Sequence, residues 1–180
     1  MAKSLGMKKY FSGKTLKFWY FKMVRQSGTP EKIARGVAVG LFVGFMIPFG
    51  FQLIVAIPLA ILFKANKFFS VTGTFVTNHF TIPFIYPFQC YLGSCLLLSP
   101  LSLKLLTGQF KSLLRDPSFE ALFELGHDVV IPFFAGGAFL AVIFAAAGYF
   151  AALGIVIQYR RKKSNRLRKA LASINTEQEK

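Results

Sequence analysis

Three long stretches of the chain contain no charged residue, and they constrain what it can fold into. They cover residues 36–63, 68–103 and 129–159. The hydrocarbon core of a bilayer is about 30 Å thick and needs about 20 apolar residues of helix to cross it. A charged side chain at its centre costs at least about 2.5 kcal/mol. Because each stretch is long and uncharged, we expect an all-α integral membrane protein.

The basic residues flank these stretches, which argues against a nucleic-acid partner. The formal net charge is +15, and 54% of the residues are hydrophobic. Nine Lys or Arg precede residue 36, and seven lie between Arg160 and Lys169. Basic residues beside apolar spans are retained in the cytoplasm, next to anionic headgroups. We therefore expect both termini to be cytoplasmic.

The same pattern divides the chain into three parts. Residues 1–28 are basic with interleaved aromatics, and we expect them to lie at the membrane interface rather than to form a disordered tail. Residues 29–159 form the membrane domain, in which 100–128 have the apolar spacing of interfacial amphipathic helices. Residues 160–180 form a basic cytoplasmic tail that we expect to be disordered or loosely helical.

A glycine face is expected on the first membrane helix. Thr29 can cap this helix, and Pro30 suits its first position. Glycine then recurs every fourth residue, at Gly36, Gly40 and Gly44. Small residues at this spacing let two helices approach closely in lipid.

The first apolar stretch is interrupted at Pro48, Phe49 and Gly50, and it is flanked by Arg35 and Lys64. A single crossing would leave Lys64 outside, against the positive-inside bias. Each arm would have about 12–14 residues, or roughly 18–21 Å of helix, which is too short to cross. We therefore favour a re-entrant hairpin that enters and leaves on the cytoplasmic side. A single kinked span is the alternative.

The second stretch, taken as residues 68–99, is also interrupted. Hydroxyl, amide and imidazole side chains crowd one short segment and are followed by prolines: Thr72, Thr74, Thr77, Asn78, His79, Thr81, Pro83 and Pro87. Proline bends or breaks a helix. We expect a broken crossing, or a half-helix followed by a crossing. Residues 129–159 are rich in Gly and Ala and predict a continuous transmembrane helix packed tightly on another.

The membrane segments carry few groups that could catalyse a reaction. There is no Asp or Glu between Lys32 and Arg115, no zinc-ligand spacing and no nucleophile elbow. We therefore expect no enzymatic activity, no metal and no cofactor. His79 either relays protons or donates to a phosphate, or it only bonds a carbonyl freed at the break, which is the interpretation we prefer.

Uncharged polar residues gather at the two breaks. They are Gln52, Asn66, Thr74, Thr77, Asn78, Thr81 and Tyr86. They either satisfy backbone groups where helices end or line a polar cavity. The ends of broken helices suit an anion, and many transporters build their sites at such breaks. The sequence leaves both interpretations open.

These residues resemble the bacterial membrane family catalogued as domain of unknown function 2062. The similarity covers roughly residues 29–153. His79 and Phe84 depart from the family, which usually has Pro at both positions, and this puts the backbone detail at that break in question. Some members look fused to glycosyltransferases, which implies a bacterial inner-membrane protein in envelope or lipid-linked sugar metabolism. The resemblance rests on Pro48, Phe49, Gly50, Phe51, Gln52, Asn66, Gly73, Thr74, Asn78, Thr81, Pro83 and Tyr86.

We expect the protein to bind or translocate an anionic, phosphate-bearing lipid or lipid-linked precursor, as an oligomer or with a membrane partner. The alternatives are a non-catalytic anchoring or assembly module for a glycosyltransferase-type partner and, less favoured, a lipid-modifying enzyme. The cytoplasmic mouth of the hairpin supplies cations to the phosphate, and the breaks near Gly50 supply N–H, hydroxyl and amide groups. The expected phosphate-binding residues are Lys32, Arg35, Lys64, Lys67, Gln52, Thr77, Asn78 and His79.

Overall fold

All regular secondary structure in the described residues is helical. The computed structural model describes residues 28–98, 101–102 and 127–178, with four earlier residues, and within the last helix it describes the side chains of 129–168. The expected interfacial segment 100–128 and most of 1–28 lie outside these ranges. The helices are α3 (Pro30–Met46), α4 (Gln52–Leu62), α5 (Lys67–Thr74), α6 (Ile82–Leu96) and α9 (His127–Gln178). The four earlier residues are Phe18, Phe21, Lys22 and Arg25.

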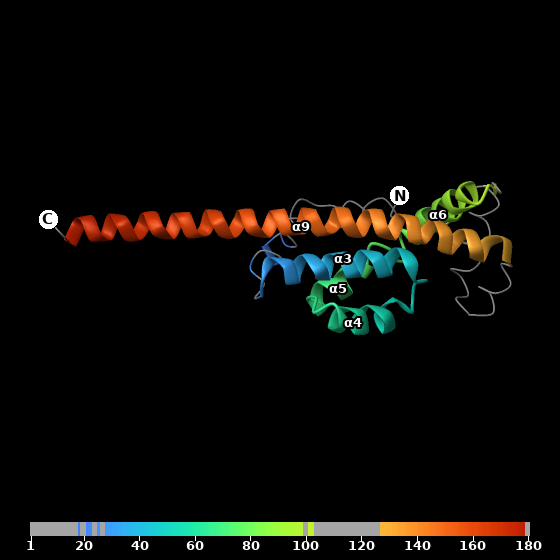
Figure 1. The fold of residues 1–180 in the computed structure, drawn as a ribbon, viewed down its shortest axis with the longest axis horizontal. Coiled ribbons are helices and arrows are strands. Elements are labelled where there is room, and N and C mark those ends of the chain that lie inside the picture. Colours follow the sequence, from blue (N-terminus) through green and yellow to red (C-terminus); the bar gives the residue numbers. More distant parts are fainter. Residues whose placement is uncertain are drawn as a thin grey trace, which may run out of the picture.

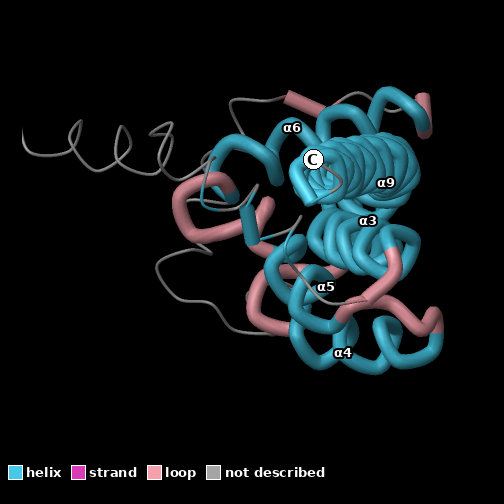
Figure 2. Tube along the Cα trace, turned by 90° about the vertical axis from the view of Figure 1, so that its left-hand side faces the viewer, coloured by secondary structure: helices cyan, strands magenta, loops and turns pink. Residues whose placement is uncertain are grey.

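The longest element, α9, runs along one side of the bundle, and α3 lies beside it (Figures 1 and 2). The two helices are antiparallel, because Ile33 near the start of α3 packs on Val156, whereas Phe45 near its end packs on Leu140. α5 and α4 lie on the far side of α3 (Figure 2). α3 is therefore the central helix, with neighbours on both sides.

The limits of α3 follow from its sequence. The Thr29 hydroxyl accepts a hydrogen bond from the Lys32 N–H at 3.2 Å, and Pro30 occupies the first turn, as the sequence predicted. The helix ends at Met46, just before Pro48, which has no N–H to continue the ladder. The chain then turns through Gly50, whose φ of 101° is in the region that favours glycine. α4 then starts at Gln52, two residues after Gly50.

The glycine face of α3 packs on α5. A Cβ atom on Gly36 would lie 2.6 Å from the Asn66 carbonyl oxygen, and one on Gly40 would lie 2.7 Å from the Gly73 Cα. A Cβ atom on Gly44 would lie 2.9 Å from a methyl group of Val76, in the turn after α5. The close approach expected from glycine spacing is thus confirmed, and its partner is α5. The contact buries a polar row along α5 and the turn after it: Asn66, Ser70, Thr74 and Thr77.

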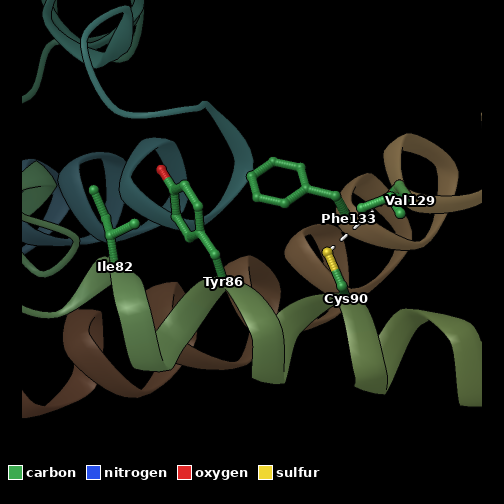
Figure 3. Packing of buried hydrophobic residues seen from close by; sticks show 5 residues of the cluster. All are labelled: Ile82, Tyr86, Cys90, Val129 and Phe133. Carbon is green, nitrogen blue, oxygen red and sulfur yellow. Dashed lines mark hydrogen bonds between the residues drawn. The ribbon is translucent and has the colours of Figure 1, made fainter. Parts of the chain in front are cut away.

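The first turns of α9 pack on α6. Ile82, Tyr86 and Cys90 lie on successive turns of α6, and they face Val129 and Phe133 of α9 (Figure 3). The backbones are close here as well, because a Cβ atom on Gly93 would lie 2.7 Å from the Gly136 nitrogen. The tight packing predicted for the small residues of 129–159 is therefore confirmed at this crossing.

One helix among the described residues is long and apolar enough to cross a membrane. It is the part of α9 from Val129 to Arg168, and only 22% of its most apolar window is buried. The core helix of a soluble domain would be mostly covered, whereas this one presents apolar side chains outward. α4 is also apolar but has 11 residues. The helix of α9 continues to Gln178, so the tail is helical rather than disordered.

Candidate functional site

Cations from two distant segments meet at one end of the bundle. The guanidinium of Arg35 donates to the Phe63 carbonyl at 2.9 Å, and the Asn66 N–H donates to the Lys32 carbonyl at 2.9 Å. These bonds hold the start of α3 against the end of α4 and the start of α5. We call this region the basic end. It carries the four cations predicted for the hairpin mouth, Lys32, Arg35, Lys64 and Lys67, of which the three lysines are exposed and Arg35 is half-buried.

Lys64 occupies a strained backbone position at the basic end. Its φ is 49°, in the left-handed region that glycine favours. The Ala65 N–H donates to the Ala60 carbonyl at 2.8 Å, and the Lys64 N–H donates to the Ile61 carbonyl at 3.0 Å. This is the pattern of a helix C-terminus that usually ends on glycine. A lysine here costs stability that a glycine would not, so the strain directs attention to its charge.

Further cations come to the same end from outside the hairpin. Lys22 Nζ lies 4.2 Å from the centre of the Phe68 ring, a favourable cation–π contact. Glu31 stands in the first turn of α3, where its own N–H and the Thr29 hydroxyl hold the pKa of its carboxyl below the ordinary value. Ile33 packs on Val156, one turn before Arg160, so the end of the apolar part of α9 lies at the same end of the bundle.

The break between α3 and α4 is closed by side chains. Because Pro48 lacks an N–H, the Gly44 carbonyl has no partner one turn on. The Thr77 hydroxyl donates to that carbonyl at 2.7 Å, and the Gln52 amide donates to it at 3.1 Å. The same Gln52 nitrogen lies 2.6 Å from Thr77 Oγ1 and 3.1 Å from the Ile47 carbonyl oxygen, so its two N–H groups are shared among three acceptors. Gln52 and Thr77 are both buried, so this cluster replaces a missing helix bond.

The break between α5 and α6 is built in a similar way. Asn78 Oδ1 accepts from the N–H groups of Phe80 and Thr81, at 2.9 and 3.2 Å. The Thr81 hydroxyl accepts from the Asn78 N–H and lies 2.9 Å from the Val76 carbonyl, to which it can donate. His79 is exposed in this turn, and its side chain makes no hydrogen bond with the described residues, so the bond to a freed carbonyl that the sequence suggested for it is not found there. The other polar side chains, Gln52 and Thr77 at one break and Asn78 and Thr81 at the other, bond backbone groups of their own chain.

Tyr86 joins the two breaks. Its hydroxyl accepts a hydrogen bond from the Phe49 N–H at 2.7 Å, and the ring packs edge-on against Phe133, with centroids 5.0 Å apart. The first turn of α6 is therefore held against the turn before α4. Neither α4 nor α6 has a side chain capping its N-terminus.

The eight predicted phosphate-binding residues fall into two separate groups. The four cations lie at the basic end, whereas Gln52, Thr77, Asn78 and His79 lie at or beyond the breaks. Arg35 and Gly44 are nine residues apart on α3, or about 14 Å at 1.5 Å per residue. One phosphate group cannot touch both groups at once. Within the described residues the basic end is the better candidate, because its lysines are exposed.

Sequence reasoning missed one buried polar side chain, Gln89. It is fully buried where α6 crosses α9, and its Nε2 donates to the Phe133 carbonyl at 2.9 Å. Its Oε1 has no hydrogen-bond partner among the described residues. A lone amide in an apolar run was the available signal, because such a group needs a partner in a helix interface.

Comparison with known proteins identifies the family. A family model described as "Uncharacterized protein conserved in bacteria (DUF2062)" matches residues 13–165. Searches among curated proteins and among solved structures found no match. The matched region contains α3, α4, α5, α6 and most of α9. Because the match covers well over half of the chain, the protein belongs to the DUF2062 family of bacterial proteins.

Proposed function

We propose that this protein binds the phosphate group of an anionic lipid at its basic end, in the bacterial inner membrane. The observation that carries the proposal is the junction at which Arg35 bonds the Phe63 carbonyl and Asn66 bonds the Lys32 carbonyl. This junction gathers cations from separate segments beside apolar helices. No acidic residue other than Glu31 occurs before Asp116, so little in this part of the chain offsets their charge.

The proposed membrane placement follows from the same contacts. If α9 crosses the membrane with Arg160 at the cytoplasmic surface, then the start of α3 also lies near that surface, because Ile33 packs beside Val156. The bond from Arg35 to Phe63 returns the end of α4 to it. We therefore infer that residues 36–63 form a re-entrant hairpin and that both termini are cytoplasmic. The rival, a single kinked span, would separate the two ends that this bond joins.

Binding is better supported than translocation. Each cation near the surface contributes about 1 kcal/mol of attraction to an anionic membrane, and the exposed apolar faces of α4 suit acyl or prenyl chains. Translocation would need a route past the α3–α5 contact. At Gly40 the two backbones are so close that even a Cβ atom would collide with Gly73. The glycine face is filled by α5 and offers no lateral opening there.

Lys64→Gly tests the proposal because the folding and binding effects have opposite signs. Glycine suits the φ of 49°, so thermal stability should stay the same or rise. Binding of phosphatidic acid over phosphatidylcholine should weaken about fivefold, the equivalent of one near-surface cation. Native mass spectrometry of protein released from nanodiscs of both lipids measures the difference.

Two matched variants complete the experiment. Lys64→Arg should retain the selectivity, because it keeps the charge. Lys162→Gln removes a cation that lies past the basic end and should change the selectivity less than Lys64→Gly. Unchanged selectivity in Lys64→Gly, or an equal loss in Lys162→Gln, would show that the mouth of the hairpin is not a phosphate site.

A second candidate, an anchoring or assembly module, is favoured by the polar clusters. Gln52, Thr77 and Asn78 bond backbone groups of their own chain, as expected if the breaks are packing devices. If the wild-type protein shows no preference for phosphatidic acid over phosphatidylcholine, this candidate replaces the lipid-binding function.

A further inference from the structure

The side chain of Asn66 carries a hydrogen-bond donor that the fold does not use. Asn66 precedes α5, and its Oδ1 accepts a hydrogen bond from the Phe69 N–H at 3.3 Å. This bond explains the oxygen of the amide, because it caps the helix. The Nδ2 atom of the same amide donates to no described residue, although Asn66 is only 8% exposed. Capping alone does not require this nitrogen, since Ser and Asp cap helices equally well.

The unused nitrogen remains accessible. Gln89 Oε1 is the one side-chain polar atom of the described residues that is fully buried without a partner. Asn66 Nδ2 also has no partner there, but it is not sealed from its surroundings in this way. It belongs to the same planar amide as the capping oxygen, so it lies over the first turn of α5. A largely buried side chain therefore presents a donor at the N-terminus of this eight-residue helix.

Two further donors at this junction have no partner among the described residues. One is the Lys67 N–H, in the first position of α5, where a helix leaves its N–H groups unbonded. The other is Arg35 Nη2, because Arg35 bonds the chain after α4 through Nη1 and the Glu31 carbonyl through Nε. Arg35 comes close to Asn66, since a Cβ atom on the following residue, Gly36, would lie 3.2 Å from the Asn66 Cβ. The three donors thus belong to one junction.

The oxygen atoms beside these donors are already engaged. The carbonyls of Lys32 and Phe63 accept the bonds that form the junction, and Asn66 Oδ1 accepts a bond from α5. The ammonium groups of Lys64 and Lys67 are exposed and add positive charge. The described groups of the junction therefore match a ligand that brings negative charge and hydrogen-bond acceptors.

A phosphate monoester is a ligand of this kind. It carries about −1.5 to −2 charges at pH 7 and has three oxygens that accept hydrogen bonds strongly. In a diester one of these oxygens is esterified, so the group loses an acceptor and its second charge. The free N–H groups and the dipole at a helix N-terminus also favour an anion.

We propose that Nδ2 of Asn66, the Lys67 N–H and Nη2 of Arg35 recognise a phosphate monoester. The inference rests on the proposed lipid-binding function and deepens it by naming the class of headgroup. The lysines of the basic end attract any anionic lipid, whereas directed N–H groups distinguish a monoester from a diester. Asn66 is then a residue that determines specificity, although it carries no charge itself.

The wild-type protein tests the class of ligand. Phosphatidic acid and phosphatidylmethanol differ by one methyl group, which turns the monoester into a diester and blocks one oxygen. Native mass spectrometry of protein released from nanodiscs that contain both lipids should show about tenfold more phosphatidic acid bound, the contribution of one hydrogen bond to a charged group. Equal binding of the two lipids would overturn the inference. If both were still preferred over phosphatidylcholine, the proposed function would stand without it.

Two variants test the residue. Asn66→Asp keeps the cap of α5 and nearly the same shape, but it replaces the donor with a carboxylate, so the preference for phosphatidic acid over phosphatidylmethanol should be lost. Asn66→Gly removes the donor without changing the net charge, and glycine is also a tolerated cap; it should lose the preference as well. Ser70→Ala is the matched control, because it truncates a buried side chain of the same helix that bonds the Asn66 carbonyl. The control should keep the preference, and a preference retained in Asn66→Asp would overturn the inference.

A soluble ester separates a lipid headgroup from a free phosphate compound. Glycerol phosphate has the same monoester without acyl chains, and it can be added to the protein in phosphatidylcholine nanodiscs. It should bind more weakly than phosphatidic acid, because the apolar face of α4 adds contacts to a lipid alone. If it binds as tightly and Asn66→Asp abolishes that binding, the monoester site is confirmed and the lipid function is lost. If the wild-type protein prefers phosphatidic acid over neither phosphatidylmethanol nor phosphatidylcholine and leaves glycerol phosphate unbound, both proposals fail.

Discussion

At the scale of single residues, side chains supply the hydrogen bonds that the backbone loses where the helices break. Pro48 deprives the Gly44 carbonyl of its normal partner, and Thr77, which is 33 residues away in sequence, supplies a hydroxyl at 2.7 Å. In a low-dielectric surrounding an unpaired carbonyl is costly. A polar side chain at a helix break in a membrane protein therefore has a structural role that must be measured before a ligand is assigned to it.

Thr77→Val measures that role. The change keeps the shape of the side chain but removes the hydroxyl that bonds Gly44 and Gln52. We expect a loss of about 1–3 kcal/mol in the free energy of unfolding, because buried groups lose a partner. Thr72→Val is the control, since the Thr72 hydroxyl bonds the Phe68 carbonyl of its own helix at 2.8 Å. Unfolding in mild detergent compares the two, and equal losses would contradict the special role of Thr77.

At the scale of elements, the packing of the central helix depends on the contact between α3 and α5. The glycines on α3 lie against the backbone of α5. Where the two helices are closest, neither Gly40 of α3 nor Gly73 of α5 has room for a Cβ atom. Glycine faces of this kind let helix backbones approach closely, and close van der Waals contact is a main source of association for helices in a bilayer. This contact explains why an eight-residue helix such as α5 is stable here.

Gly40→Ala should push α3 away from α5. The added methyl group would lie 2.7 Å from the Gly73 Cα, and it has only backbone to displace. We expect a loss of roughly 1–3 kcal/mol in unfolding free energy, the usual cost of overpacking. Gly154→Ala in α9 is the matched control, because nothing lies within 4 Å of its Cβ position. The control should be neutral or stabilising, and an equal loss in both variants would refute the contact.

At the scale of the whole molecule, cations from four separate segments of the described residues meet at one end. Lys22, Lys32, Lys64 and Arg160 are distant in sequence, yet the contacts of Phe68 and Asn66 and the packing of Ile33 on Val156 bring them together. A bundle with cations at one end and apolar faces along its length suits a membrane with anionic headgroups on that side. The proposed topology is the simplest placement that keeps all these cations at one surface.

Cysteine labelling tests this topology. In a cysteine-free background, an impermeant maleimide should label Lys67→Cys and Ser164→Cys in inside-out vesicles but not in intact cells. Both positions are exposed, so access to the side chain is not limiting. Labelling of Lys67→Cys from outside the cell, with Ser164→Cys still inside, would replace the hairpin with a single kinked span. Labelling of Ser164→Cys from outside would reverse the whole arrangement.

The sequence by itself determined the helical class, the family, the start of α3 at Thr29 and Pro30, and the positions of the breaks. These depend on local physics: the hydropathy of a stretch, the missing N–H of Pro48 and the spacing of glycines along one helix. The sequence also indicated that the glycines would support a close contact, but it left the partner helix open.

Only the tertiary structure decided which groups share a site. It placed Gln52 and Thr77 on the Gly44 carbonyl, about 14 Å along α3 from Arg35, and so divided a single predicted site into two. It also put Lys64 in a left-handed conformation and left Gln89 Oε1 without a partner among the described residues. The reason is physical: a hydrogen bond between residues far apart in sequence depends on how helices pack, and no local pattern encodes that distance.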